Sequence, residues 1–302
     1  MRKNTDGSDA VIQDLRTRFG FTRPFAAMLA RRGLVDDAAI ESFLHPETTE
    51  LAEPLALSDM DRAAARIKRA IDAGERICVY GDYDTDGVSA TAILLDALRT
   101  LSANVTFLLP SRFGEGYGLN NAAVDAMHAD GVRLIVTVDN GISAHAEIAY
   151  AKSLGMDTVV TDHHRCHETL PDAEAVVCAS RSDQDPALGC LCGATVAMLL
   201  AEALGVRIGK YLPVAALATM ADVVPLTDLN RAIVRKGLPL VGMQPGLAAL
   251  LDAAGITEIT GEGVLSFILA PRINAAGRMG DASRAVRLLL TGDEGERQAL
   301  AA

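Results

Sequence analysis

Tryptophan is absent from the 302-residue chain, and aromatic residues make up only 4% of it. The core therefore cannot be built around large rings. It must consist mainly of alanine, leucine, valine and isoleucine, in a chain that is half hydrophobic. A chain of this length suffices for one large domain or two ordinary domains with a sizeable buried interior.

The chain also has no long hydrophobic run. The longest apolar segment, residues 213–226, contains Asp222 and is shorter than the about 20 residues that a membrane helix needs. The polar N-terminus lacks the apolar core of a signal peptide. Five cysteines, an odd number without framework spacing, indicate a reducing compartment. We therefore expect a cytoplasmic protein without a membrane partner.

Basic residues are too few to outnumber the acidic ones, and the formal net charge is −11. Composition alone argues against a nucleic-acid binder, because phosphate contacts normally require a basic face. A metal site built from carboxylates would account for part of this acidity.

Short apolar runs alternate with helical patterns through the middle of the chain. The runs cover residues 76–80, 105–109, 133–138, 158–160 and 175–178, and a helix is expected over 88–100. This pattern predicts an α/β fold: a mostly parallel sheet with helices on both faces. We expect a helical N-terminal extension over 1–73, the α/β domain over 74–281, and the start of a connector to absent C-terminal domains over 282–302.

Acidic residues follow several of these runs at the point where each strand should end. Right-handed crossovers would place the loops after the strands along one edge of the sheet. Carboxylates that converge there would repel one another unless a cation is bound. The residues concerned are Asp82, Asp84 and Asp86 in the first loop, Asp139, the run Asp162-His163-His164, and Asp222 in a later helical stretch.

A simpler interpretation is that each acid caps the helix that follows it. For Asp139 or Asp222 taken alone, helix capping explains the residue well. Four acidic loops on one edge, one of them with paired histidines, favour a shared metal site instead.

The same loops resemble the four motifs of the DHH phosphoesterases. The matching stretches are residues 79–87 (VYGDYDTDG), 136–142 (VTVDNGI), 160–164 (VTDHH) and 221–226 (ADVVPL). Residues 43–46 (FLHP), 110–119 (PSRFGEGYGL) and 271–279 (PRINAAGRM) narrow the resemblance to the RecJ branch. The similarity runs from about residue 19 to the end, and its strength lies in the order and spacing of the motifs.

The resemblance implies a 5′→3′ exonuclease, specific for single-stranded DNA, that releases 5′-mononucleotides in DNA repair and recombination. It also implies two divalent cations, and oxygen ligands with one imidazole suit Mn²⁺ or Mg²⁺, with Mn²⁺ preferred. Asp139 is the candidate bridging and catalytic ligand, and Asp82 could instead orient a neighbour. The implied metal ligands are Asp82, Asp84, Asp86, Asp139, His163 and Asp222.

His164 is expected to face the scissile phosphate as a proton donor or charge stabiliser. Asp162 either holds the imidazole ring of a histidine in position or caps the backbone. Cys78 and Cys178 fall in apolar strands and are expected to be buried side chains that fill space in the core.

Four residues are expected to contact the substrate. Arg112 and Arg278 could hold a terminal 5′-phosphate, since a guanidinium fork suits that group; the alternative is that both are solvated loop residues. Tyr117 could stack on a base or pack against its own domain. Asn274 is a candidate polar contact in the same cleft.

RecJ-type enzymes carry a second phosphoesterase lobe and an oligonucleotide-binding module, and neither is expected within this sequence. Strand binding, and contacts with a single-strand-binding protein and a helicase, are therefore expected in the missing parts. We expect the chain to fold and bind metal but to degrade long DNA poorly.

Two other functions compete. A DHH hydrolase of short oligonucleotides or cyclic dinucleotides would share the metal site, but the loops of Arg112 and Arg278 favour the DNA enzyme. A non-catalytic scaffold would be expected to have lost metal-binding acids, which this chain retains.

Overall fold

The computed structural model describes residues 9–51, 53–110 and 118–302, and it divides into two compact units, Met1–Glu50 and Leu51–Ala302. Over residues 9–50, the first unit contains three helices, α1 (Asp9–Phe19), α2 (Arg23–Arg31) and α3 (Asp37–Leu44). Leu15, Leu29 and Ile40 are buried at its centre. This unit therefore has a small apolar core of its own.

The second unit is built on one sheet, which has five parallel strands within the described residues. The strands are β1 (Arg76–Tyr80), β2 (Val105–Leu108), β3 (Val132–Val138), β4 (Asp157–Asp162) and β5 (Ala175–Cys178). Their order is β2-β1-β3-β4-β5. The chain order reverses between β1 and β3, and in open α/β sheets ligands bind at the carboxyl ends of the strands at such a point.

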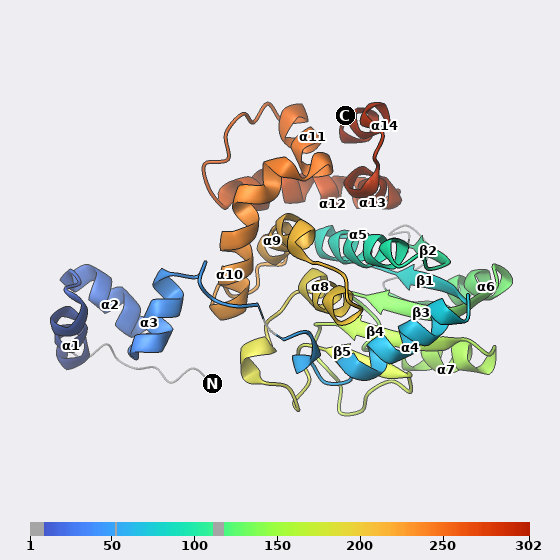
Figure 1. Cartoon of the computed structure of the whole chain (residues 1–302), viewed down its shortest axis with the longest axis horizontal. Coiled ribbons are helices and arrows are strands. Elements are labelled where there is room, and N and C mark those ends of the chain that lie inside the picture. The colour runs from blue at the N-terminus through green and yellow to red at the C-terminus, as the bar shows by residue number, and fades with distance from the viewer. Residues whose placement is uncertain (1–8, 52, 111–117) are drawn as a thin grey trace. The chain divides into compact units, whose positions relative to one another are not determined.

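Helices lie on both faces of the sheet (Figure 1), and each face supports a separate apolar core. Side chains alternate along each strand, so Ile77 and Val79 of β1 point to one face while Cys78 and Tyr80 point to the other. The first face is covered by α4 (Met60–Asp72), α5 (Thr85–Thr100) and α8 (Gly193–Ala203), and the second by α6 (Asn121–Ala129) and α7 (His145–Ser153). This confirms the expected α/β class.

Helices follow β5 and extend the first core. They are α9 (Leu212–Ala221), α10 (Asp228–Gly237), α11 (Pro245–Ala253), α12 (Ala270–Arg278), α13 (Ser283–Leu290) and α14 (Glu294–Ala301). Short turns η1 (Pro54–Ala56), η2 (Pro186–Leu188), η3 (Gly209–Tyr211), η4 (Leu238–Met243) and the π-helical η5 (Leu265–Leu269) link them and their neighbours. α9 and α12 matter most here, since each contributes residues near the strand ends.

The largest differences from the sequence-based expectation are in α5 and β4. α5 begins at Thr85 rather than at residue 88, because the Asp84 side chain accepts a hydrogen bond of 2.9 Å from the Gly87 amide and caps the helix. β4 runs on to Asp162 and carries that carboxylate into the strand end. The expected domain boundaries at residues 73 and 281 stay a prediction. No helix in the described ranges is both long and apolar enough to cross a membrane.

Candidate metal centre

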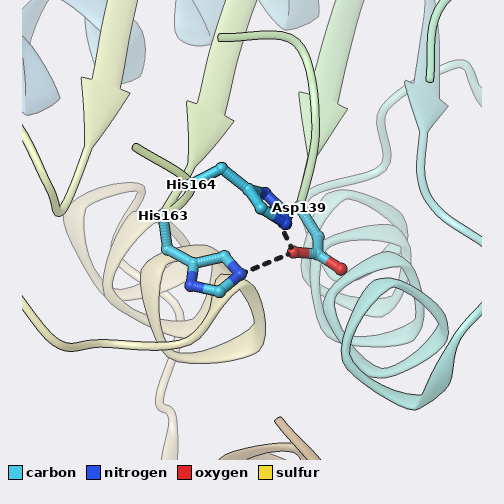
Figure 2. A group of neighbouring side chains, drawn as sticks. All are labelled: Asp139, His163 and His164. Carbon is cyan, nitrogen blue, oxygen red and sulfur yellow. Dashed lines mark ion pairs between the residues drawn. The ribbon is translucent and has the colours of Figure 1, made fainter. Parts of the chain in front are cut away.

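The acidic loops converge beside the switch point of the sheet. Loops after β1, β3 and β4, the first turn of α5 and the end of α9 place ligand atoms within 4.8 Å of one another in three overlapping groups. Figure 2 shows one group, Asp139 with His163 and His164, beneath the strand ends. The other groups are Asp86 with His163 and Asp222, and Asp82 with Asp84 and Asp139. All six expected metal ligands therefore lie in one cluster.

His163 lies at the centre of this cluster. Its Nε2 is 3.0 Å from Asp139 Oδ1 and 3.6 Å from Asp86 Oδ2, and its Nδ1 is 3.7 Å from Asp222 Oδ2. Asp222 reaches the cluster because it ends α9. Asp139 follows β3 directly, and the loop after β4 supplies the imidazole.

Asp86 is fixed by a helix remote in sequence. Its two carboxylate oxygens accept hydrogen bonds from the Gly193 amide (2.7 Å) and the Ala194 amide (2.8 Å). These amides open α8, where backbone N–H groups lack partners within the helix and favour negative charge. α8 thus holds Asp86 against the metal cluster.

Gly193 also lies against Asp139. A Cβ atom added at Gly193 would be 2.7 Å from the Asp139 Cβ and 2.9 Å from its Oδ1. Asp139 itself has a left-handed backbone, with φ of 60°. Only a residue without a side chain allows α8 to approach the strand end this closely.

Burial and mutual repulsion raise the pKa values of these carboxyl groups. Burial raises the pKa of Asp86 to about 6, while His163 and the Ala194 amide oppose the rise. Burial, with the charges of Asp86 and Asp84, raises the pKa of Asp139 well above its usual range. Burial also raises the pKa of Asp222. A bound cation would remove this penalty, since it pairs with the charged forms.

His164 is held by Asp162 rather than by the other acids. Its Nδ1 is 2.8 Å from Asp162 Oδ1, and that bond raises the pKa of His164 to about 9 against the effect of partial burial. The other carboxylate oxygen accepts from the Ile142 amide at 2.9 Å. Burial alone would raise the pKa of Asp162, but the bonds from His164 and Ile142 outweigh it, and the pKa falls below its usual value. Asp162 therefore both orients the imidazole and caps the backbone.

The residues of the cluster fit a divalent cation. Asp139 Oδ1 and His163 Nε2 are buried and 3.0 Å apart, yet neither makes a hydrogen bond of good geometry. Buried polar atoms normally have a partner, and a shared ion would satisfy both. Carboxylate oxygens with one imidazole suit Mn²⁺ or Mg²⁺.

The structure describes two of the four residues that were expected to contact the substrate. Asn274 is half-buried in α12, and its Oδ1 accepts from the amide (2.8 Å) and the hydroxyl (2.9 Å) of Thr85, at the start of α5. Arg278 is exposed in the last turn of α12. Arg112 and Tyr117 lie outside the described residues.

A pocket of about 250 Å³ opens beside His164, on the side of the loop after β3. Its lining includes Asn140, Ser143, Glu147 and Leu119. The Asn140 amide ties the ends of β1 and β3 together through the carbonyls of Tyr80 (3.2 Å) and Val138 (2.9 Å). Asn140 is therefore held in place where it lines the pocket next to the cluster.

Sequence reasoning missed the amides of Gly193 and Ala194. The contact of Gly193 with Asp86 joins positions 107 residues apart, which no local pattern indicates. The available signal was a glycine directly before an apolar helical run, which is consistent with an anion-binding helix start but is too common to identify one.

Comparison with known proteins places this geometry in a family. The model of the DHH family, N-terminal domain, matches residues 76–224. The single-stranded-DNA-specific exonuclease RecJ of Bacillus subtilis is 40% identical over 296 residues, which cover 96% of this chain and 38% of the relative.

Two solved structures are also similar. A crystal structure of exonuclease RecJ bound to manganese has a TM-score of 0.77 at 40% identity, over 83% of this chain and 66% of that one. RecJ from Thermus thermophilus in complex with Mn²⁺ has a TM-score of 0.81 at 35% identity, over 97% and 42%.

The chain spans less than half the length of the curated relatives, 38% of the Bacillus protein and 46% of its Escherichia coli counterpart. The matched family region nevertheless begins with β1 and extends past Asp222, so it contains the whole sheet and every residue of the cluster. The chain belongs to the DHH family, and proteins of that family that are 40% identical to it are RecJ exonucleases.

Proposed function

We propose that this chain is the catalytic part of a metal-dependent exonuclease that hydrolyses single-stranded DNA from the 5′ end to 5′-mononucleotides, in DNA repair and recombination. The observation that carries the proposal is the convergence of five aspartates and His163 at the switch point of the sheet. The similarity to RecJ proteins, described as single-stranded-DNA-specific exonucleases, supports the substrate. It favours DNA over the short oligonucleotides or cyclic dinucleotides of the alternative.

Two cations, Mn²⁺ or Mg²⁺, are proposed to bind here. Asp82 and Asp84 would hold one, and Asp86 and Asp222 the other. Asp139 belongs to two of the three ligand groups and His163 to two, so both occupy central positions. Asp139 is the proposed bridging ligand because it belongs to two groups and is buried, at 1% exposure.

When bound, the two ions would supply Lewis acidity toward the scissile phosphate and lower the pKa of a water molecule. The protein's part is to keep the ligands in place. α8 holds Asp86 through two amides, and the Asp84 cap ties the first loop to α5. Rigid ligands reduce the reorganisation that accompanies charge transfer to the leaving oxygen.

His164 is proposed to act on the phosphate directly. Its side chain is 44% exposed, whereas the His163 side chain is 12% exposed. Asp162 engages Nδ1, so a proton given to the leaving oxygen would come from Nε2. The Asp162 carboxylate also stabilises the imidazolium form that this role requires.

The DNA end is proposed to lie at the end of α12 that carries Arg278. Arg278 and Arg112 would hold the 5′-phosphate, and Tyr117 would stack on a base. Asn274 would use its Nδ2 group, because its Oδ1 already accepts from Thr85. A single-strand-binding protein and a helicase are the proposed partners through further segments, with the cytoplasm as the place of action.

The proposal is tested with a nuclease assay in Mn²⁺ on four substrates: a 5′-phosphorylated single strand, the 5′-hydroxyl strand, the duplex and a dinucleotide. We expect the 5′-phosphorylated strand to be cleaved fastest, with mononucleotides as products. Faster turnover of the dinucleotide would support the small-substrate hydrolase instead.

A pair of variants distinguishes the loss of metal-dependent turnover from a general effect of replacing an aspartate. Asp84→Asn should abolish turnover, whereas Asp61→Asn, at an exposed position at the start of α4, should leave it unchanged. Unchanged hydrolysis by Asp84→Asn would contradict a metal-dependent mechanism at this site.

A further inference from the structure

Two cysteines meet directly behind the paired histidines. Cys166 follows His164 by two residues, and Cys178 ends β5. Their sulfur atoms are 3.5 Å apart, and both lie 3.5 Å from the hydroxyl of Ser180. All five cysteines lie in described ranges and are free thiols, and the only sulfur–sulfur contact among them is this one.

The pair is joined to the backbone of the catalytic loop. Cys178 Sγ donates to the His164 carbonyl oxygen at 3.4 Å, and the Ser180 hydroxyl donates to the same oxygen. The loop that presents His163 and His164 therefore rests on the cysteine pair. A covalent change at Cys178 would remove its hydrogen bond to this carbonyl, which belongs to the residue that carries the His164 imidazole.

We propose that Cys166 and Cys178 are an oxidative modification site, at which hydrogen peroxide forms a reversible disulfide that withdraws His163 and His164 from the metal cluster. The disulfide chemistry is independent of the proposed nuclease function, while its effect on turnover rests on that function. Cys166 is half-buried and so accessible to a small oxidant, and Cys178 is fully buried beside it.

The chemistry balances in two steps. The Cys166 thiolate attacks one peroxide oxygen, the O–O bond breaks, and the departing hydroxide takes a proton to become water. The resulting sulfenic acid is attacked by Cys178, the S–O bond breaks, and the Cys178 proton leaves with the oxygen as a second water. Two thiols are oxidised by two electrons, and one peroxide is reduced to two waters.

The geometry demands movement. A disulfide has a sulfur–sulfur distance of about 2 Å, so the two atoms must close from 3.5 Å. Cys178 also loses its S–H group, and with it the hydrogen bond to the His164 carbonyl. Since β5 is paired along its length with β4, the exposed loop of Cys166 is the part that moves.

The other cysteines provide a matched control. Cys190 is exposed but touches no other sulfur, so it can be oxidised without forming the bond. Cys192 is buried beside the hydroxyls of Thr195 and Thr219. Replacing Cys190 therefore removes the most accessible thiol and leaves the pair intact.

The test treats the whole chain with hydrogen peroxide before metal is added. Peptide mapping by mass spectrometry then locates the link, and calorimetry measures Mn²⁺ affinity independently of activity. We expect a Cys166–Cys178 peptide lacking two hydrogens. Mn²⁺ affinity should fall roughly 10- to 100-fold, the range seen when support of a metal ligand is lost. Dithiothreitol should restore both, Cys166→Ser should prevent both, and Cys190→Ser should behave as the unaltered protein.

The possible outcomes test three claims separately: the disulfide, its effect on the histidines, and the nuclease function. Absence of the link while Cys190 is oxidised would refute the modification site. A link that leaves Mn²⁺ affinity unchanged would refute its control of the histidines. If the reduced protein binds Mn²⁺ but cleaves no DNA, the nuclease proposal fails, while the mass and affinity measurements still decide the disulfide.

Discussion

At the scale of single residues, Asp139 has both an unfavourable backbone conformation and an unfavourable electrostatic environment. Its backbone is left-handed, with φ of 60°, and its side chain is buried among other acids. Aspartate tolerates this conformation better than most residues, but a buried carboxylate near others still reduces stability. Such unfavourable placement is typical of sites that a ligand completes.

Replacing this carboxylate should separate stability from function. Asp139→Asn removes a charge that Asp86 and Asp84 repel, so metal-free protein should unfold at a higher temperature than the unaltered chain. The variant should lose Mn²⁺ affinity by at least about 100-fold, above the 10- to 100-fold typical of groups that only support a ligand. Calorimetry and thermal unfolding in EDTA measure the two effects.

Asp61→Asn, on an exposed turn of α4, is the matched control and should change neither quantity. A metal-free Asp139→Asn protein less stable than the parent would show that the carboxylate stabilises the fold, contrary to the expectation.

The raised pKa values also predict a pH dependence. The folded pKa of Asp86, about 6, lies above the about 4 of an unfolded carboxyl. Such a group contributes stability that is present below the unfolded pKa and is lost as pH rises through the folded pKa. Metal-free protein should therefore unfold at a higher temperature at about pH 5 than at about pH 7.5.

Mn²⁺ should reverse this order, because it binds the deprotonated carboxylates. Asp162, with a lowered pKa, acts in the opposite sense and only at more acidic pH. Thermal unfolding with EDTA or Mn²⁺ at both pH values is the measurement, and equal pH profiles with and without metal would count against the cluster as an ion site.

At the scale of elements, the start of α8 is the main support of the cluster. Gly193→Ala places a methyl group 2.9 Å from Asp139 Oδ1 and so must displace either α8 or the strand end. We expect Mn²⁺ affinity to fall roughly 10- to 100-fold. We expect a cost in unfolding free energy of about 1–3 kcal/mol, the usual effect of overpacking.

Gly209→Ala is the control, since an added Cβ there meets nothing within 4 Å. Calorimetry on both variants decides the matter: equal Mn²⁺ affinities would mean that the close approach of α8 has no role in holding the ligands.

The elements also show what sequence could predict. The strands and the acidic loops were predictable because alternating apolar runs and strand-end carboxylates are local signals. The expected start of α5 at residue 88 is three residues too late, because Asp84 both belongs to the metal cluster and caps the helix. The contact of Asp86 with α8 spans 107 residues and that of Asn274 with Thr85 spans 189. Local patterns carry no information about such pairs.

At the scale of the whole molecule, the cluster belongs entirely to one compact unit. All six proposed ligands lie within Leu51–Ala302, and the first unit has its own core. Residues 51–302 alone should therefore bind Mn²⁺ with a dissociation constant within about twofold of the whole chain, a difference under ~0.5 kcal/mol.

Calorimetry on the shortened and whole chains, with circular dichroism to verify folding, makes the comparison. A folded 51–302 protein with much weaker Mn²⁺ binding would mean that the first unit contributes to the site.

Helix α12 contacts the loop that carries proposed metal ligands, and it also carries a proposed DNA-binding residue. Its Asn274 holds the start of α5, and a Cβ on its Gly277 would be 2.5 Å from the Tyr83 carbonyl, so the helix presses on the loop between Asp82 and Asp84. Arg278, in the last turn of the same helix, is exposed to solvent. If a DNA end bound at Arg278 changes the affinity of this loop for the ions, thermodynamic reciprocity requires the ions to change the affinity for DNA by the same factor.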